Sequence, residues 1–196
     1  MAEVTAAMVK TLREMTNLGM MECKTALVEA GGDTDKAVEI LRKKGSIKSA
    51  KRAEREAAEG CVQCYIHTNG KVGVMVEMRC ETDFVAKNEH FQQFVRDICM
   101  HIAWADPLAV DRTGLAPELI EKEKDIYREQ VVGKPEHIID KILEGKLRDF
   151  YQRVCLLDQP FVKDDKKSVA DIIAEQVHKM GENVQVKRFA RFEVGG

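Results

Sequence analysis

Cys61 and Cys64 are separated by two residues, a spacing that on a turn serves thiol–disulfide exchange or half of a zinc site. Here the pair falls in a segment of alternating apolar residues, and residues three apart on a strand point to opposite faces. No second pair of Cys or His residues follows at a spacing that would complete a zinc site. We therefore predict no metal site, and we interpret the cysteines as reduced, buried thiols: Cys23, Cys61, Cys64, Cys80, Cys99 and Cys155.

Three further patterns could support chemistry. The stretch GMMECKT, residues 19–25, resembles a phosphate-binding loop, but Cys23 stands where such a loop needs a glycine before its lysine. The five histidines form no HExxH motif and pair with no serine elbow, although distant residues could still assemble an active site. The basic stretch RKKGSIKSAKRAER, residues 42–55, could contact RNA phosphates but lacks aromatic residues for base stacking. We predict no enzyme activity, no cofactor and no direct nucleic-acid contact.

Composition and charge are those of a soluble globular protein. Of the 196 residues, 44% are hydrophobic and 33% are charged, and the formal net charge is -2. These values exclude a disordered chain and a protein that coats nucleic acid through charge alone. The N-terminus has no apolar signal core, and no segment approaches the roughly 18 apolar residues of a membrane span. The sequence therefore predicts a cytoplasmic protein without membrane contact.

Residues 1–45 are expected to form a module of three short helices. Apolar residues recur at helical spacing in residues 4–15, 20–30 and 34–44. Gly31 and Gly32 can end the second helix, and Asp33 can cap the third. Residues 46–59 alternate charged residues with alanine and predict a solvated, charged helical linker.

The apolar pattern then changes from helical to strand period. Apolar residues occupy every second position in residues 62–66 and 72–80, which predicts a β-hairpin with one buried face. Asn69–Gly70 predicts a type I′ turn between the two strands. On the first strand the alternating apolar residues, expected on the buried face, are Val62, Cys64 and Ile66.

Residues 60–196 as a whole predict an α+β core domain. Helical patterns cover residues 88–105, 117–132, 134–155 and 168–180. Residues 184–194 alternate again and are expected to complete a three-stranded antiparallel sheet with the hairpin. The predicted fold class is therefore α+β, with a three-helix module joined to a core of one sheet and several helices.

Residues 80–88, CETDFVAKN, place Asp83 and Phe84 between the second strand and a helix. On composition alone, Thr82 or Asp83 would stabilise the turn as a cap, and Phe84 would pack against the helix as a hydrophobic staple. If Phe84 instead faces water, we expect an aromatic side chain of this size to be bound by a partner.

Long segments of the chain resemble the translation elongation factor Ts family. VKTLREMTNLGMMECKTALVEAGGDTDKAVEILRKKG, residues 9–45, resembles its ubiquitin-associated-like N-terminal module. VGVMVEMRCETDFVAKNEHFQQF, residues 72–94, resembles its signature. GKPEHIIDKILEGKLRDFYQRVCLLDQPFVKD, residues 133–164, and RFARFEVGG, residues 188–196, resemble its C-terminal core. The resemblance implies a guanine-nucleotide exchange factor for elongation factor Tu in translation elongation.

The resemblance also implies how the TDFVAKN motif would act. Its Asp-Phe pair, here Asp83 and Phe84, would enter the GTPase domain of elongation factor Tu near the magnesium and phosphate sites and promote GDP release. The motif residues that would support this turn are Thr82, Val85, Lys87 and Asn88.

Two other regions are implied to touch the partner. The N-terminal module would grip the same GTPase domain through Arg13, Met20 and Met21. The loop around Val162 would face another domain of the partner. His67, at the hairpin, resembles a histidine in the second core copy of longer family members, which is a weaker correspondence.

Chain length separates this sequence from the longer members, which carry two related core halves and a coiled-coil insertion. With one hairpin and one core, the chain resembles the short members, which pair as homodimers. The open edges of a three-stranded sheet support that implication. Two alternatives remain. One is a helical adaptor that binds a peptide or a ubiquitin-like partner without moving nucleotide, and the other is an enzyme with an exposed cysteine of low pKa.

Overall fold

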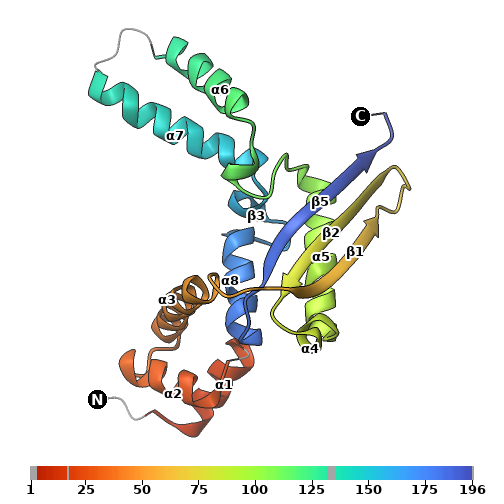
Figure 1. Ribbon diagram of the computed structural model, residues 1–196. Coiled ribbons are helices and arrows are strands. Elements are labelled where there is room, and N and C mark those ends of the chain that lie inside the picture. The colour runs from red at the N-terminus through yellow and green to blue at the C-terminus, as the bar shows by residue number, and fades with distance from the viewer. Residues whose placement is uncertain (1–3, 17, 132–135, 196) are drawn as a thin grey trace.

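The computed structural model describes residues 4–16, 18–131 and 136–195 of the chain. A helical module lies at the N-terminal end, and a core that contains the main sheet follows it (Figure 1). The arrangement confirms the α+β class that the sequence predicted.

The N-terminal module consists of α1 (Ala6–Thr16), α2 (Met20–Glu29) and the first part of α3 (Thr34–Arg52). Gly31 and Gly32, with φ values of 65° and 88°, end α2, and Asp33 accepts a hydrogen bond from the Lys36 amide at 3.1 Å. The helices enclose a small apolar core of buried residues: Val9, Leu12, Cys23, Ala26, Leu27, Ala37 and Leu41. Local caps and helical periodicity thus predicted this part of the fold well.

The helix α3 continues past the module and reaches the core. Arg52 Nη1 donates a hydrogen bond to the Val177 carbonyl oxygen of α8 (Val169–Met180) at 2.9 Å. Just beyond the helix, the Arg55 carbonyl oxygen accepts a hydrogen bond from Asn183 Nδ2 at 2.8 Å. Residues 53–56 are exposed, so this end of the predicted linker is solvated as well as hydrogen-bonded to the core, but α3 ends at Arg52 and does not extend to residue 59.

The main sheet has three antiparallel strands in the order β1-β2-β5: β1 (Glu59–Ile66), β2 (Val72–Cys80) and β5 (Gln185–Glu193). The helix α5 (Glu89–Ala105) covers one face of the sheet (Figure 1), and its residues Phe91, Val95 and Ile98 are fully buried there. The helix α8 adds Val169 and Val177 to the same apolar core. These observations confirm the predicted three-stranded sheet.

The inward face of β1 is the opposite of the predicted one. Cys61 and Tyr65 lie across from Met78 and Val74 of β2, whose side chains are buried. Residues that pair directly across two strands share a face, so the odd-numbered residues of β1 face the core. The residues expected there lie on the outer face and are exposed: Val62, Cys64 and Ile66.

The turn between β1 and β2 also differs from the predicted type I′ turn. A type I′ turn needs positive φ at both central residues. Gly70 has a φ of 67°, whereas Asp106 is the one non-glycine residue in the described part of the chain with positive φ, so Asn69 does not qualify. The Gly70 amide donates to the His67 carbonyl oxygen at 2.8 Å, and residues 67–71 all lie between the strands. The hairpin is confirmed, but its connection is longer than expected.

Two helices, α6 (Pro117–Glu129) and α7 (Glu136–Val154), form a hairpin that projects from the core (Figure 1). Tyr127 and Phe150 are buried between them, in an apolar cluster separate from the main core. The short strands β3 (Pro160–Phe161) and β4 (Asp164–Ser168) follow and lead into α8. The sequence predicted both helices but not that they form an arm.

Candidate partner-binding site

Two successive helix caps build the turn after β2. Thr82 is the N-cap of the short helix α4 (Asp83–Ala86), and its Oγ1 accepts a hydrogen bond from the Val85 amide at 3.4 Å. Asn88 is the N-cap of α5, and its Oδ1 accepts a hydrogen bond from the His90 amide at 2.8 Å. Because both caps satisfy backbone N–H groups, the chain passes from strand to helix in one defined conformation.

Phe84 points away from the protein, and 82% of it is exposed. The next two residues are directed inward: Val85 packs against the main apolar core, and Ala86 is buried. Phe84 is therefore not the hydrophobic staple that composition alone favoured. A large ring held in water beside anchored neighbours is a candidate contact surface.

Asp83 and Lys87 form an ion pair across one turn of α4, with 2.7 Å between Oδ2 and Nζ. The hydrogen bond from Lys87 holds the pKa of the Asp83 carboxyl below its usual value, and the same bond raises the pKa of Lys87. The Lys87 side chain is mostly exposed and that of Asp83 is about half exposed, so the pair contributes little to the stability of the fold. Its main effect is to present an ionised carboxylate next to the exposed ring.

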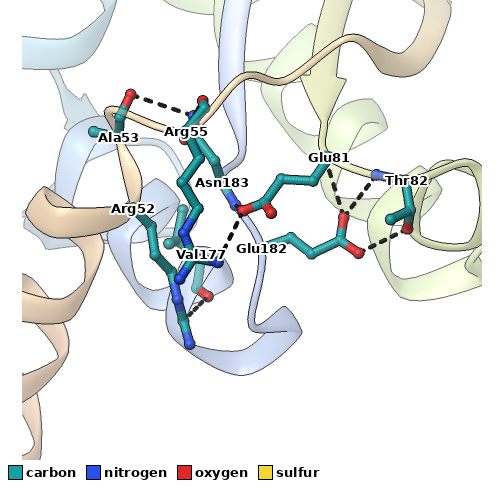
Figure 2. A network of polar contacts seen from close by, with 8 residues as sticks. All are labelled: Arg52, Ala53, Arg55, Glu81, Thr82, Val177, Glu182 and Asn183. Atoms are coloured by element: carbon teal, nitrogen blue, oxygen red, sulfur yellow. Dashed lines mark hydrogen bonds and ion pairs between the residues drawn. The ribbon is translucent and has the colours of Figure 1, made fainter.

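A polar network holds the other side of the turn (Figure 2). Glu182 Oε2 accepts hydrogen bonds from the backbone amides of Glu81 and Thr82 at 3.1 and 3.0 Å, and Oε1 accepts one from Thr82 Oγ1 at 2.7 Å. Asn183, the next residue, donates its own amide to Glu81 Oε1 at 2.6 Å. Sequence reasoning missed Glu182 and Asn183, because their partners lie about a hundred residues away along the chain.

Cys61 and Cys64, whose spacing first suggested a redox or zinc pair, lie on opposite sides of β1, as the strand pattern predicted. Cys61 packs against the apolar core, whereas Cys64 is exposed, so the prediction that all six thiols are buried is wrong for Cys64. Burial raises the pKa of Cys80 and Cys155 to about 11 and that of Cys99 to about 12, so these three thiols are weak nucleophiles at neutral pH.

Within residues 4–16, 18–131 and 136–195, no group of three or more His, Cys, Asp or Glu side chains is arranged to hold a metal ion. In the same ranges, no helix combines the length and the apolar character that crossing a membrane requires.

Comparison with known proteins places the chain in a family. A family model described as Elongation factor TS matches residues 2–196. A protein named Elongation factor Ts from Oleidesulfovibrio alaskensis is 52% identical over 197 aligned residues that cover 100% of both chains. Proteins with the same name from Thermodesulfovibrio yellowstonii and Desulforamulus reducens are each 54% identical, over 98% and 100% of this chain and 96% and 91% of their own.

The chain belongs to the elongation factor Ts family. Membership makes it a nucleotide exchange factor of translation elongation. The turn just described lies within the segment by which the sequence resembled this family.

The elongation factor Ts resemblance also pointed to the N-terminal module, whose proposed contact residues lie on α1 and α2. All three are exposed: Arg13, Met20 and Met21. Met21 is 72% exposed, which is unusual for an apolar side chain next to a packed helix core.

The last turn of α8 lies between the module and the Phe84 turn. On one side Glu22 of α2 approaches His178 Nε2 at 3.6 Å. Lys179 lines a cavity of about 200 Å³ between the module and α8, and also a groove of about 600 Å³ that reaches Val85 and Asn88. The N-terminal module and the Phe84 turn, the two candidate contact regions, therefore lie on either side of the C-terminal end of α8.

His67 and Val162 lie away from Phe84. His67 precedes β2 whereas Phe84 follows it, so the two are at opposite ends of that strand; His67 Nδ1 lies 3.0 Å from Tyr65 Oη. The Val162 amide donates to His101 Nδ1 at 3.2 Å, close to the end of α5, whose beginning adjoins Phe84. An α5 of 17 residues is about 25 Å long, so Val162 and Phe84 lie far apart on the protein.

His101 supports the Val162 loop from inside the protein. Its ring is fully buried, and burial lowers its pKa, which favours the neutral form. Because Nδ1 accepts from the Val162 amide, the proton resides on Nε2 and is donated to Gln159 Oε1 at 3.0 Å. A neutral histidine thus fixes the backbone at the base of this loop.

Proposed function

We propose that this chain accelerates GDP release from elongation factor Tu by inserting the Asp83–Phe84 turn near the partner's magnesium and phosphate site. The observation that carries the proposal is the ring of Phe84, which is 82% exposed on a turn whose flanking residues are anchored. A ring presented in this way can enter a partner without any rearrangement of its own subunit. Membership of the elongation factor Ts family supports the choice of partner.

The proposed exchange needs no covalent step. Elongation factor Tu holds GDP in one conformation, and the factor binds better to a conformation in which the phosphate and magnesium contacts are distorted. Thermodynamic linkage then requires that the factor weaken nucleotide binding by the same ratio as nucleotide weakens binding of the factor. Phe84 supplies apolar contact area for the distorted conformation, and Asp83 supplies a negative charge beside the magnesium site.

The N-terminal module provides the second contact with the same GTPase domain in this proposal. Three exposed side chains support it: Arg13, Met20 and Met21. Because α3 runs from the module to Arg52, and the Arg52 side chain and the Arg55 carbonyl oxygen are hydrogen-bonded to the core, both contacts are held on one body. Binding at one then raises the effective concentration of the other. Val162, and more weakly His67, would contact other parts of the partner, and Thr82, Val85, Lys87 and Asn88 would support the turn.

We also propose a division of the chain into an N-terminal module of residues 1–45, a connecting segment of residues 46–59 and a core of residues 60–196. The partner acts in translation, so the proposed location is the cytoplasm. Direct nucleic-acid binding is not part of the proposal. In the basic connecting segment, Arg52 is bonded to the core and Arg55 lies 3.6 Å from Glu81. These contacts support the view that the two arginines stabilise the fold and do not bind phosphates.

A release assay tests the proposal directly. Elongation factor Tu loaded with fluorescently labelled GDP is mixed with this protein and excess unlabelled GDP, and loss of the label is timed. The proposal expects acceleration that rises with the concentration of the protein and saturates. The helical adaptor considered from the sequence would bind elongation factor Tu in a pull-down but leave the release rate unchanged, and that result would exclude the exchange function.

We further propose that two copies pair through the outer face of the sheet. Ile66, Met75 and Phe192 are exposed there, one on each strand, and the order β1-β2-β5 leaves β1 and β5 as open edges. An identical surface on a second copy can cover these apolar groups by twofold symmetry.

Light scattering after gel filtration tests the pairing. The natural protein should elute with twice the mass of one chain at micromolar concentration, and Met75→Lys should elute as a monomer. Ile126→Lys, which changes an exposed residue on the helical arm, is the matched control and should remain dimeric. A monomeric natural protein would refute the pairing.

A further inference from the structure

Glu182 holds the turn that carries Phe84 although it lies in a different part of the chain. Its carboxylate accepts three hydrogen bonds, two from the backbone amides of Glu81 and Thr82 and one from the Thr82 hydroxyl. Figure 2 shows the carboxylate facing both residues. Hydrogen bonds to an ionised acceptor are stronger than those between neutral groups, so these three restrain the residues that immediately precede Asp83 and Phe84.

The position of Glu182 is itself well defined. Gly181, with a φ of 80°, ends α8 in a left-handed conformation that directs the chain toward β2. Asn183 is buried, and its amide donates to Glu81 Oε1 at 2.6 Å while Nδ2 donates to the Arg55 carbonyl oxygen at 2.8 Å. The loop between α8 and β5 is therefore bonded on one side to the Phe84 turn and on the other to the segment that follows α3.

The hydrogen bonds of Glu182 determine the direction in which the turn leaves the sheet. Thr82 has an extended backbone, with φ of -127° and ψ of 155°, and α4 begins at the next residue. Its hydroxyl donates to Glu182 and accepts from the Val85 amide, so one side chain links the carboxylate to the first turn of α4. A helix of only four residues has little stability of its own and depends on such bonds for its orientation.

We propose that Glu182 is a positioning residue for nucleotide exchange: it holds the Thr82 cap so that Phe84 is presented in the orientation that enters the partner. This inference rests on the exchange function proposed above for Phe84. Because Asn183 binds the segment after α3, the same loop also sets the spacing between the Phe84 turn and the N-terminal module. A ring that must displace groups in a partner has to be held firmly by its own subunit, and Glu182 supplies that support.

Four single substitutions test the proposal in the labelled-GDP release assay, with the maximal rate at saturating factor measured separately from the half-saturating concentration. Glu182→Ala removes all three acceptor bonds, and displacement of the ring by about 1 Å should lower the maximal rate about tenfold to a hundredfold. Glu182→Gln should retain most of the rate, since its carbonyl oxygen can accept both amides and its NH2 group can donate to the Thr82 hydroxyl. Glu182→Asp keeps the charge but is one methylene shorter, so it should lose rate although the charge is unchanged.

The fourth substitution, Glu175→Ala, is the matched control. Glu175 lies on α8, shortly before Glu182 in the chain, and its carboxylate pairs with Lys167 at 2.7 Å, away from the turn. It should release GDP at the natural rate. A further readout is the exchange of the Glu81 and Thr82 amide protons with solvent, which should become faster in Glu182→Ala and not in Glu175→Ala.

The outcomes separate this inference from the function on which it rests. If Phe84→Ala releases GDP as fast as the natural protein, the exchange function of the turn is wrong. If Phe84→Ala is slow but Glu182→Asp and a folded Glu182→Ala keep the natural maximal rate, the positioning role is overturned. Glu182→Ala added to Phe84→Ala should cause no further loss, because Glu182 acts through the ring. An additive loss from the two substitutions would also overturn the positioning role.

Discussion

Replacing Phe84 by alanine should separate exchange activity from the stability of the fold. Because 82% of the residue is exposed, its ring makes few contacts within its own subunit. Exposed substitutions of this kind change the free energy of unfolding by less than about 0.5 kcal/mol. Thr82, Val85 and Ala86 keep their hydrogen bonds and packing in the variant, so the turn itself should persist.

The expected loss of activity follows from the area that the ring can bury. A phenylalanine side chain has about 200 Å² of surface, and with 82% exposed a partner can cover about 160 Å² of it. At about 25 cal/mol per Å², that area corresponds to about 4 kcal/mol, or about a thousandfold in an equilibrium constant. Only the part of this free energy that favours the distorted conformation of the partner accelerates GDP release. The maximal release rate should therefore fall by about tenfold to a thousandfold.

The assay is stopped-flow release of labelled GDP from elongation factor Tu at saturating factor. Trp104→Ala is the matched control, because Trp104 is an equally exposed aromatic residue, 72% accessible, near the other end of α5. The control should keep the natural maximal rate even if its affinity changes. Circular dichroism and urea unfolding establish that both variants are folded. A Phe84→Ala protein that is folded, saturates elongation factor Tu and still retains most of the acceleration would refute the proposal that Phe84 inserts into the partner to release GDP.

Three further predictions concern stability and reactivity. Burial holds the pKa of His101 below its ordinary value of 6.5, so the unfolded chain gains the proton first as pH falls. Urea unfolding should therefore show the full free energy of unfolding above about pH 6.5 and a lower one as pH falls toward the folded pKa. The His101→Asn protein should lose less stability over this pH range. Thr82→Ala should lower the free energy of unfolding by about 1 kcal/mol, and Thr82→Ser should restore it. A thiol reagent at neutral pH should label the exposed Cys64 quickly. It should label Cys99 only after unfolding, because this thiol is buried and burial raises its pKa to about 12. Equal labelling rates for the two cysteines would contradict the burial of Cys99.

Much of the fold could be predicted from short stretches of sequence, because the signals that define helices and strands are local. The cap at Asp33 and the end of α2 at Gly31 and Gly32 both appear where the sequence predicted them. The helix α8 lies within the predicted range of residues 168–180, and Ser168 forms its N-cap with a reciprocal hydrogen bond to Asp171. Each of these features depends on residues within a few positions of one another, so a window of sequence contains all the information that it needs.

The inward face of β1 could not be predicted in this way. The apolar alternation of Val62, Cys64 and Ile66 is a local signal, but the buried face was set by pairing with β2, whose alternating residues fill the core. A connection one residue longer or shorter shifts the pairing and exchanges the two faces of a strand. The result is an outer sheet face with apolar side chains, which is the surface now proposed to pair two copies.

Phe84 illustrates both what the sequence can predict and what it cannot. Its place in a turn between strand and helix followed from the sequence, since Thr82 or Asp83 was expected to cap the turn and a helical pattern begins near residue 88. Whether the ring packed inward or faced water depended on which residues of α4 met the core, and Val85 and Ala86 did so. Composition favoured the inward ring, and the tertiary structure decided otherwise.

The sequence by itself determined the longer helices, the three strands of the main sheet, the helical module at the N-terminus and the motif of the elongation factor Ts family, since these signals lie in neighbouring residues. Only the tertiary structure decided that Glu182 holds Thr82, that α3 is bonded to α8 through Arg52, and that α6 and α7 form an arm. Such contacts join residues far apart in the chain. Their formation depends on how the apolar faces pack together, which no short window of sequence contains.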